Sequence, residues 1–210
     1  MEPELLALAR RTPGFMPEPE GLALHQAALK AGRLGPLLEI GSYCGLSALY
    51  LGSAARDTAT LLFSLDHHRG SEEHQPGEEY YDPALTDAEG RVDTLPSFRR
   101  TLAEAGLESS VVVMVGHAAA VAAAWGTPLG LVFIDGGHSQ AAADADYAGW
   151  APWVAPGGLL AIHDVFPDPA AGGRPPFVIY ERALGAGWEE AGACGSLRLL
   201  RPPVRAGERP

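Results

Sequence analysis

Cysteine is scarce in this chain, and basic side chains are outnumbered by acidic ones. The 210 residues include two cysteines, Cys44 and Cys194, far apart in the sequence. This is not the pattern of a disulfide framework, and it suits a reducing compartment. Lysine and arginine number 15 against 26 aspartates and glutamates, a formal net charge of −11. We therefore expect no nucleic-acid partner, because phosphate binding requires a basic surface.

Long apolar runs are also missing. No run approaches the roughly 18 residues that a membrane span needs. The first residues, MEPELLALARR, carry two glutamates where a signal peptide carries positive charge. We expect a cytoplasmic protein with no membrane partner, built as one domain at this length. Whether it forms a homo-oligomer is left open.

Apolar strands and helical segments alternate from residue 37 onward. Near-continuous apolar strands separated by helices indicate a parallel sheet covered on both faces, which is a doubly wound α/β fold. A final pair of segments around Cys194-Gly195 predicts an antiparallel hairpin that closes the sheet. The expected parallel strands are 37–41, 60–66, 111–116, 129–135 and 157–164.

Two segments lie outside this alternation. Residues 1–36 contain two helical stretches, and we expect them to form a cap or lid ahead of a domain that spans residues 37–204. Residues 67–95 are polar and lack regular periodicity. Long loops over a site are often lids, so we expect this insertion to cover a substrate, joined by Phe15 and Met16.

Five of the seven histidines lie at the carboxyl ends of predicted strands. In open parallel sheets, ligands bind outside these ends, near the point where the strand order reverses. The positions directly after the strands are therefore the candidate functional residues.

The first strand leads into the loop Glu39-Ile40-Gly41-Ser42-Tyr43-Cys44-Gly45. Glycine at 41 and 45 lets the backbone approach a ligand. Tyr43 stands where the dinucleotide fingerprint has its middle glycine, which argues against NAD. Asp66 ends the second strand, where nucleoside-binding folds place an acid on the ribose hydroxyls; its alternative role is to cap a helix.

Asp135, His138, His163 and Asp164 follow two strands that should be neighbours. Acids and imidazoles that converge at one edge are costly unless they bind a cation or transfer protons. Oxygen and nitrogen ligands of this kind fit a divalent cation. In the alternative without a metal, Asp135 binds an amino group of a cofactor and His163 is a core histidine.

The segment LLEIGSYCGLSALYL (37–51) resembles motif I of class I S-adenosylmethionine-dependent methyltransferases. Residues 131–165 resemble the Asp-Gly-x-His-Ser segment and the Pro-Gly-Gly strand of a bacterial small-molecule O-methyltransferase-like subfamily of that class. The resemblance to this class covers roughly residues 20–201. It implies a mostly parallel seven-stranded, Rossmann-like sheet with a reversed last hairpin.

The resemblance also implies roles for single residues. Asp66 would bind the ribose of S-adenosylmethionine, and the turn at His117 would lie along the adenine. The methionine moiety would be held by Glu39, Gly41, Ser42, Tyr43 and Gly45.

The strand ends at Asp135 and His163-Asp164 are similar to the metal site of catechol-type O-methyltransferases. This likeness implies magnesium or manganese on Asp135, His163 and Asp164, with His138 as general base; the histidine in the pair favours softer ions. We predict methyl transfer from S-adenosylmethionine to a small-molecule hydroxyl. The alternatives are a nicotinamide-dependent oxidoreductase and a non-catalytic nucleoside-binding protein.

Overall fold

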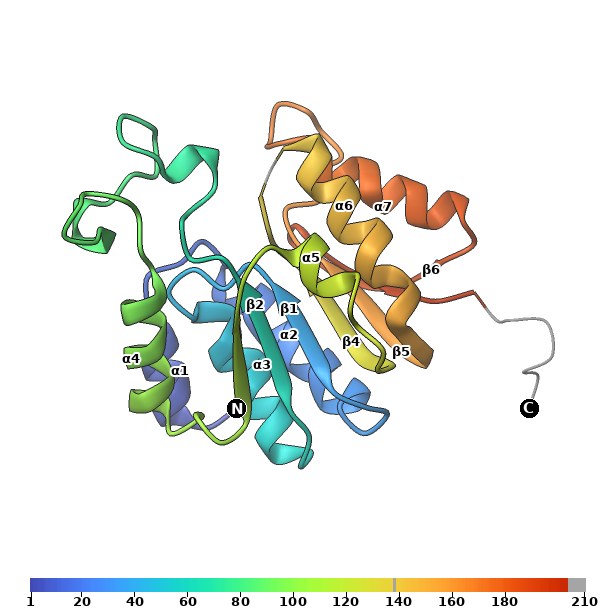
Figure 1. The fold of residues 1–210 in the computed structure, drawn as a ribbon. Helices are drawn as coiled ribbons and strands as arrows, with labels where there is room; N and C mark the ends of the chain where they lie inside the picture. The colour runs from blue at the N-terminus through green and yellow to red at the C-terminus, as the bar shows by residue number, and fades with distance from the viewer. Residues whose placement is uncertain (138, 204–210) are drawn as a thin grey trace.

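The computed structural model describes residues 1–137 and 139–203, and its centre is a seven-stranded sheet between two layers of helices (Figure 1). The strand order is β3-β2-β1-β4-β5-β7-β6. Strands β1 to β5 are parallel, and β7 runs antiparallel to both β5 and β6. This confirms the predicted fold class, including the final hairpin. The strands are β1 (Leu37–Ile40), β2 (Leu62–Asp66), β3 (Val111–Val115), β4 (Leu129–Ile134), β5 (Val154–Ile162), β6 (Glu189–Cys194) and β7 (Leu197–Arg201).

Each face of the sheet is covered by its own set of helices. One face packs against α1 (Pro3–Ala9), α2 (Glu18–Ala31), α3 (Leu46–Asp57) and α4 (Leu95–Ala105), around a core that includes Leu49 and Phe98. The other face packs against α5 (Ala118–Ala122), α6 (Gln140–Trp150) and α7 (Pro175–Gly185), around a core that includes Trp150 and Ile179. Both layers exist because the parallel strands are apolar on both sides.

The N-terminal helices are part of the first core. Leu24 and Ala28 of α2 are fully buried, and α2 packs against α3 and the sheet. Met16, just before α2, is also buried. The division of the chain at residue 37 stays a prediction, and the structure adds that α2 shares its hydrophobic core with the sheet that follows.

One strand boundary differs from the prediction. The strand expected over 157–164 begins earlier, because Pro156-Gly157-Gly158 lies inside β5, which starts at Val154. The pairing shifts there, because Leu129 pairs with Val154 whereas Leu131 pairs with Leu159. Gly157 has a φ of +78°, so the extra residues bulge out of the strand and do not end it.

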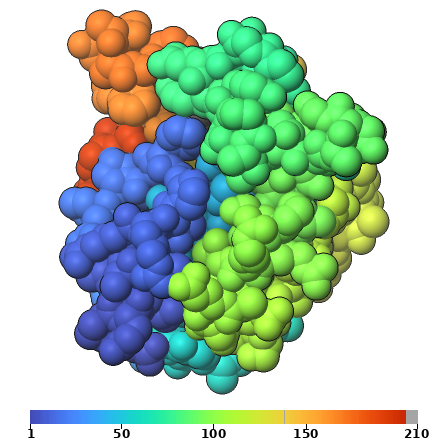
Figure 2. Space-filling view, turned by 90° about the vertical axis from the view of Figure 1, so that its left-hand side faces the viewer, coloured from blue at the N-terminus to red at the C-terminus, as the bar shows by residue number. Residues whose placement is uncertain are grey.

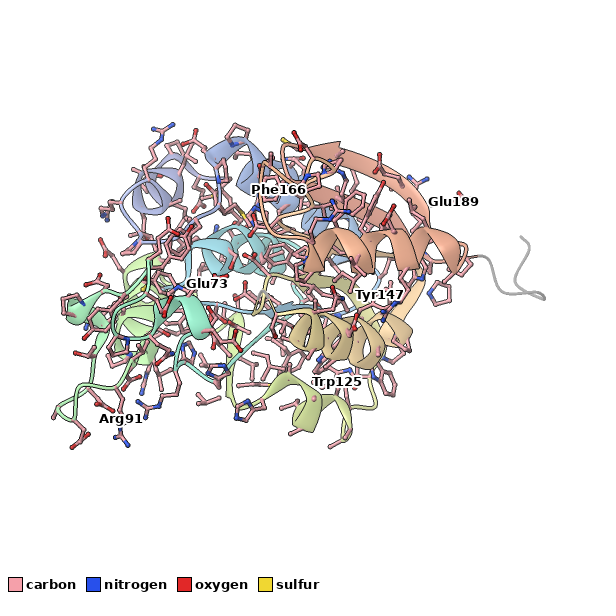
Figure 3. All side chains as sticks on the ribbon, turned by 90° about the horizontal axis from the view of Figure 1, so that it is seen from above. Glu73, Arg91, Trp125, Tyr147, Phe166 and Glu189 are labelled. Carbon is pink, nitrogen blue, oxygen red and sulfur yellow. The ribbon has the colours of Figure 1, made fainter. Side chains whose placement is uncertain are left out.

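The carboxyl ends of the parallel strands share one edge of the sheet, and two long segments project over it. One is the insertion 67–95, which contains only two short 3-10 turns, Glu72–His74 and Pro83–Leu85. The other follows β5 and carries Phe166 (Figure 3). Figure 2 shows the insertion lying beside the N-terminal segment on the face of the molecule.

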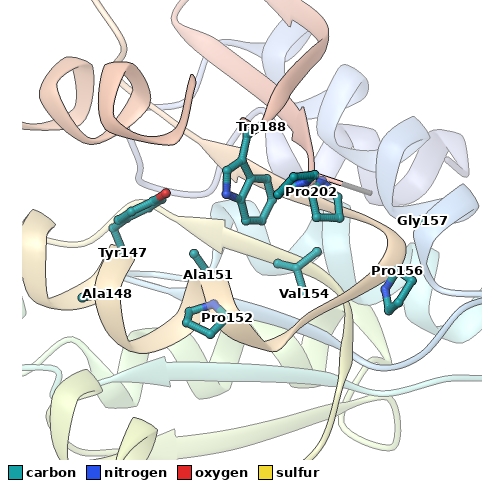
Figure 4. A pocket seen from close by; sticks show the side chains of 10 residues that line it. Tyr147, Ala148, Ala151, Pro152, Val154, Pro156, Gly157, Trp188 and Pro202 are labelled. Atoms are coloured by element: carbon teal, nitrogen blue, oxygen red, sulfur yellow. The ribbon is translucent and has the colours of Figure 1, made fainter. Parts of the chain in front are cut away.

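The opposite end of the sheet has an apolar cavity of about 610 Å³ (Figure 4). It lies beside the start of β5 and beyond the end of β7, away from the strand ends that carry the candidate residues. Among the described residues, its lining has no charged side chain, and we do not assign it to catalysis. The lining includes Tyr147, Ala151, Pro152, Val154, Trp188 and Pro202.

Over residues 1–137 and 139–203, no helix is both long enough and apolar enough to cross a membrane.

The contact between α2 and β4 yields a first prediction. A side chain at Gly130 would collide with the carbonyl of Ala31 and would lie 2.9 Å from that of Gly35. Backbone atoms cannot rotate away, so Gly130→Ala should lower the free energy of unfolding by about 1–3 kcal/mol, as overpacked cores do. Urea unfolding measures this change. Gly126→Ala is the matched control, because no atom of the described part of the chain lies within 4 Å of its added carbon; equal stability of the two variants would contradict the prediction.

Candidate functional site

The loop after β1 is shaped by two glycines and by contact with the loop after β4. Gly41 and Gly45 have φ values of +87° and +95°, which side chains rarely adopt. A side chain at Gly41 would also collide with the backbone carbonyl of Asp135. The two loops therefore touch at the point between β1 and β4 where the strand order reverses.

Asp66 holds this loop through its carboxylate. Oδ2 accepts hydrogen bonds from the N–H groups of Ser42, at 2.9 Å, and Tyr43, at 3.1 Å. Oδ1 accepts one from the N–H of His68 at 2.7 Å. One side chain at the end of β2 thus fixes both the candidate cofactor loop and the start of the insertion. A helix cap, the alternative considered above, would not account for these contacts.

Glu39 lies beneath the loop and has no exposed surface. Its Oε2 accepts from the Ser47 hydroxyl at 2.7 Å, and its Oε1 accepts from the Ser64 hydroxyl at 2.6 Å. The Ser64 hydroxyl is also 2.7 Å from that of Ser42. Burial raises the pKa of Glu39 to about 7 against the lowering effect of the two serines. Glu39 therefore supports the loop through a chain of hydroxyl groups.

Histidines flank the ends of β2 and β3. The rings of His67 and His117 lie 5.1 Å apart, and His117 precedes α5 as its N-terminal cap residue. His68 is 2% exposed, and its Nδ1 is 2.8 Å from the Thr94 hydroxyl. His68 thus ties the start of the insertion to its end.

Asp135, His163 and Asp164 come together at the ends of β4 and β5. One ligand atom from each residue lies within 4.8 Å of the others. The Nδ1 atom of His163 is 3.1 Å from Oδ1 of Asp135 and 3.3 Å from Oδ1 of Asp164. The predicted convergence of these strand ends is therefore present in the fold. His138, the predicted base, lies outside the described residues.

A third acid, Glu20 of α2, belongs to this cluster and was missed by sequence reasoning. Its Oε2 is 2.7 Å from Nε2 of His163, and Glu20 is 6% exposed. Its oxygens also accept hydrogen bonds from the N–H and hydroxyl of Ser196, both at 3.0 Å. The sequence carries a signal for the burial of Glu20, because this residue occupies an apolar-stripe position with Leu24, one turn along the helix, but it carries none for the contact with His163.

The acids around His163 determine its charge. Burial lowers the pKa of His163, but the carboxylates of Asp135 and Asp164 outweigh burial and raise the pKa to about 11. Without a cation, the ring therefore carries protons on both nitrogens at neutral pH. A cation on Nδ1 would have to displace one of these protons, so its affinity would increase with pH.

An aromatic cluster lies over the loop after β1. It joins three separate parts of the chain: the N-terminal segment, the loop itself and the insertion. The Phe15 ring lies 5.6 Å from Tyr43 and 4.9 Å from Tyr80, and the His74 ring lies 5.1 Å from Tyr43. Phe15 is 58% exposed and Tyr80 is 41% exposed, so part of the apolar surface of this cluster is open to solvent.

The buried Glu39 gives a prediction on pH. Its pKa is 4.5 ordinarily and about 7 in the fold, so between these values the folded state holds one proton more than the unfolded state. The free energy of unfolding should fall as pH rises through this window. Glu39→Gln should remove this pH dependence, because glutamine does not titrate. The free energy of unfolding of the variant, relative to that of the parent chain, should therefore increase by up to about 3 kcal/mol from pH 4.5 to pH 8. Urea unfolding at several pH values measures it, with the exposed Glu108→Gln as control; a difference independent of pH would refute it.

Comparisons with known proteins agree with this architecture. The family model described as a methyltransferase domain matches residues 38–165, more than half of the chain. The O-methyltransferase TomG from Streptomyces achromogenes, involved in tomaymycin synthesis and solved with SAM, has a TM-score of 0.65 at 19% identity, with 97% of this chain and 92% of that chain covered. The O-methyltransferase from Bacillus cereus in complex with SAH has a TM-score of 0.62 at 17% identity, with 96% and 91% covered.

A putative caffeoyl-CoA O-methyltransferase from Staphylococcus aureus has a TM-score of 0.62 at 13% identity, with 93% of this chain and 88% of that chain covered. At these identities, the likenesses to solved structures show the fold, and the family model carries the assignment. The chain belongs to the methyltransferase domain family, which confirms the resemblance to class I S-adenosylmethionine-dependent methyltransferases.

Proposed function

We propose that this protein transfers the methyl group of S-adenosylmethionine to a hydroxyl of a small molecule. The main support is the loop after β1, which Asp66 fixes at the switch point of a methyltransferase fold. Ligands of such sheets bind at this point. Two similar structures are complexes with SAM and with SAH, which supports the choice of cofactor.

Different residues of the candidate site can bind different parts of the cofactor. Gly41, Ser42, Tyr43 and Gly45 would hold the methionine moiety, with Glu39 beneath them. A carboxylate has about four acceptor positions, and Asp66 uses three for backbone N–H groups. The remaining one would accept a hydrogen bond from a ribose hydroxyl. His117 would lie beside the adenine.

Asp135, His163 and Asp164 fit a divalent cation as a donor set. They offer two carboxylates and one imidazole nitrogen from neighbouring strand ends, which suits magnesium, manganese or a softer ion. When bound, the cation would lower the pKa of the acceptor hydroxyl. His138 would accept the hydroxyl proton, since an imidazole suits this task at neutral pH.

The rest of the site would align the reactants and exclude water. Methyl transfer from a sulfonium is a direct displacement, so alignment is a main contribution that the protein makes. The insertion and Phe15 place the aromatic cluster over the cofactor loop, where it would cover the acceptor as a lid. The nicotinamide and non-catalytic alternatives have no observation in their favour.

Cofactor binding tests the role of Asp66. Asp66→Ala should weaken S-adenosylmethionine binding by about 1.5–3 kcal/mol, because a charge-assisted hydrogen bond and the order of the loop are lost. Isothermal titration calorimetry measures the affinity, and circular dichroism checks folding. Asp57→Ala, at the far end of α3, is the control. Unchanged affinity in a folded Asp66→Ala variant would contradict the assignment.

Removal of the cation and of the base tests the chemistry. With a panel of small hydroxyl acceptors, release of S-adenosylhomocysteine should stop in excess chelator and return with magnesium or manganese. His138→Ala should slow turnover by ~10²–10⁴-fold while cofactor affinity is kept. Full activity in chelator would remove the cation from the proposal, and a fully active His138→Ala would remove the base.

A further inference from the structure

We infer that Glu20 is a positioning residue for methyl transfer: its carboxylate anchors Nε2 of His163 and thereby directs Nδ1 at Asp135 and Asp164. The inference rests on the proposed function and deepens it, because it gives the N-terminal helix α2 a role in the site. Glu20 itself acts only through His163.

The first argument is the cost of placing this acid in the interior. A buried carboxylate is strongly unfavourable unless it is paired and hydrogen-bonded. Glu20 is 6% exposed, and both of its oxygens are used: Oε1 by the N–H of Ser196, and Oε2 by the Ser196 hydroxyl and His163. Ser196 and His163 thus provide the compensation that keeps the acid in place.

The second argument is the orientation of the imidazole. The hydrogen bond at one ring nitrogen decides what the other nitrogen can do. At 2.7 Å from the Glu20 carboxylate, Nε2 keeps its proton and the ring cannot turn without breaking this contact. Nδ1 is then held 3.1 Å and 3.3 Å from the oxygens of Asp135 and Asp164. A carboxylate behind a ligand histidine is how proteins orient such ligands.

The third argument is that the surrounding backbone leaves room for Glu20. A side chain on Gly195, in the turn between β6 and β7, would collide with Oε1 of Glu20. Gly195 has a φ of +53°, and the next residue donates to the same oxygen. Helix α2, the end of β5 and the hairpin turn therefore meet at one carboxylate.

The experiment compares Glu20→Gln with Glu18→Gln, a change at a partly exposed position on the same helix. The Nε2 proton of His163 is buried against a carboxylate, so in the parent chain its NMR signal should lie far downfield and exchange slowly. Glu20→Gln should shift or lose this signal with or without magnesium. Manganese affinity should fall about 10–100-fold and kcat should fall, while S-adenosylmethionine affinity stays. Glu18→Gln should match the parent chain in all four measurements.

The outcomes separate this inference from the proposed function. An unchanged His163 signal in a folded Glu20→Gln variant overturns the inference, even if the parent chain binds manganese and transfers methyl groups. If the parent chain binds no manganese, the cation is removed from the proposed function, and the His163 signal and kcat still decide the role of Glu20. Should Glu20→Gln fail to fold, Gly195→Ala displaces the carboxylate without removing it, and an unchanged His163 signal there overturns the inference.

Discussion

The structure depends on how the protein compensates carboxylates that meet at one edge of its sheet. Parallel strands bring Glu39, Asp66 and Asp135 to this edge because all of their carboxyl ends point the same way. The charges of Asp135 and Asp66 add to the burial that raises the pKa of Glu39. Each acid has its own solution: hydroxyl donors for Glu39, backbone N–H groups for Asp66, and the His163 ring for Asp135. The candidate site consists largely of these acids and the groups that bind them.

The same accumulation of acids explains what the edge can bind. Under the proposed function, the cofactor brings a positive sulfonium and an ammonium group, and the cation brings two further charges. Both ligands are drawn to a partly desolvated acidic surface, where charges interact more strongly than in water. Burial disfavours the ionised form of a carboxyl group, as the raised pKa values of Glu39 and of Asp146 in α6, both about 7, indicate. Acids clustered at the edge of the sheet reduce stability, but they increase the affinity for cationic ligands.

Much of this could be predicted from sequence because it depends on local patterns. Apolar runs located the parallel strands, and the residues that follow them, such as Asp66 and Asp135, were correctly brought to one edge. Glu20 could not be placed in the site, since its partner His163 is distant in the sequence and its role appears only when α2 packs on the sheet. The bulge at Gly157 could not be predicted from the sequence for a similar reason. Pro-Gly-Gly is typical of turns, and only the register with β4 shows that the strand continues.

Contact between the loops links the two halves of the site. Since even one carbon added to Gly41 would collide with the carbonyl of Asp135, the loops after β1 and β4 have no free space between them. The backbone of Gly41 therefore lies against that of Asp135, whose side chain contacts His163. His163 in turn is anchored to α2 through Glu20. The candidate cofactor loop, the candidate cation cluster and helix α2 thus form one continuous set of contacts.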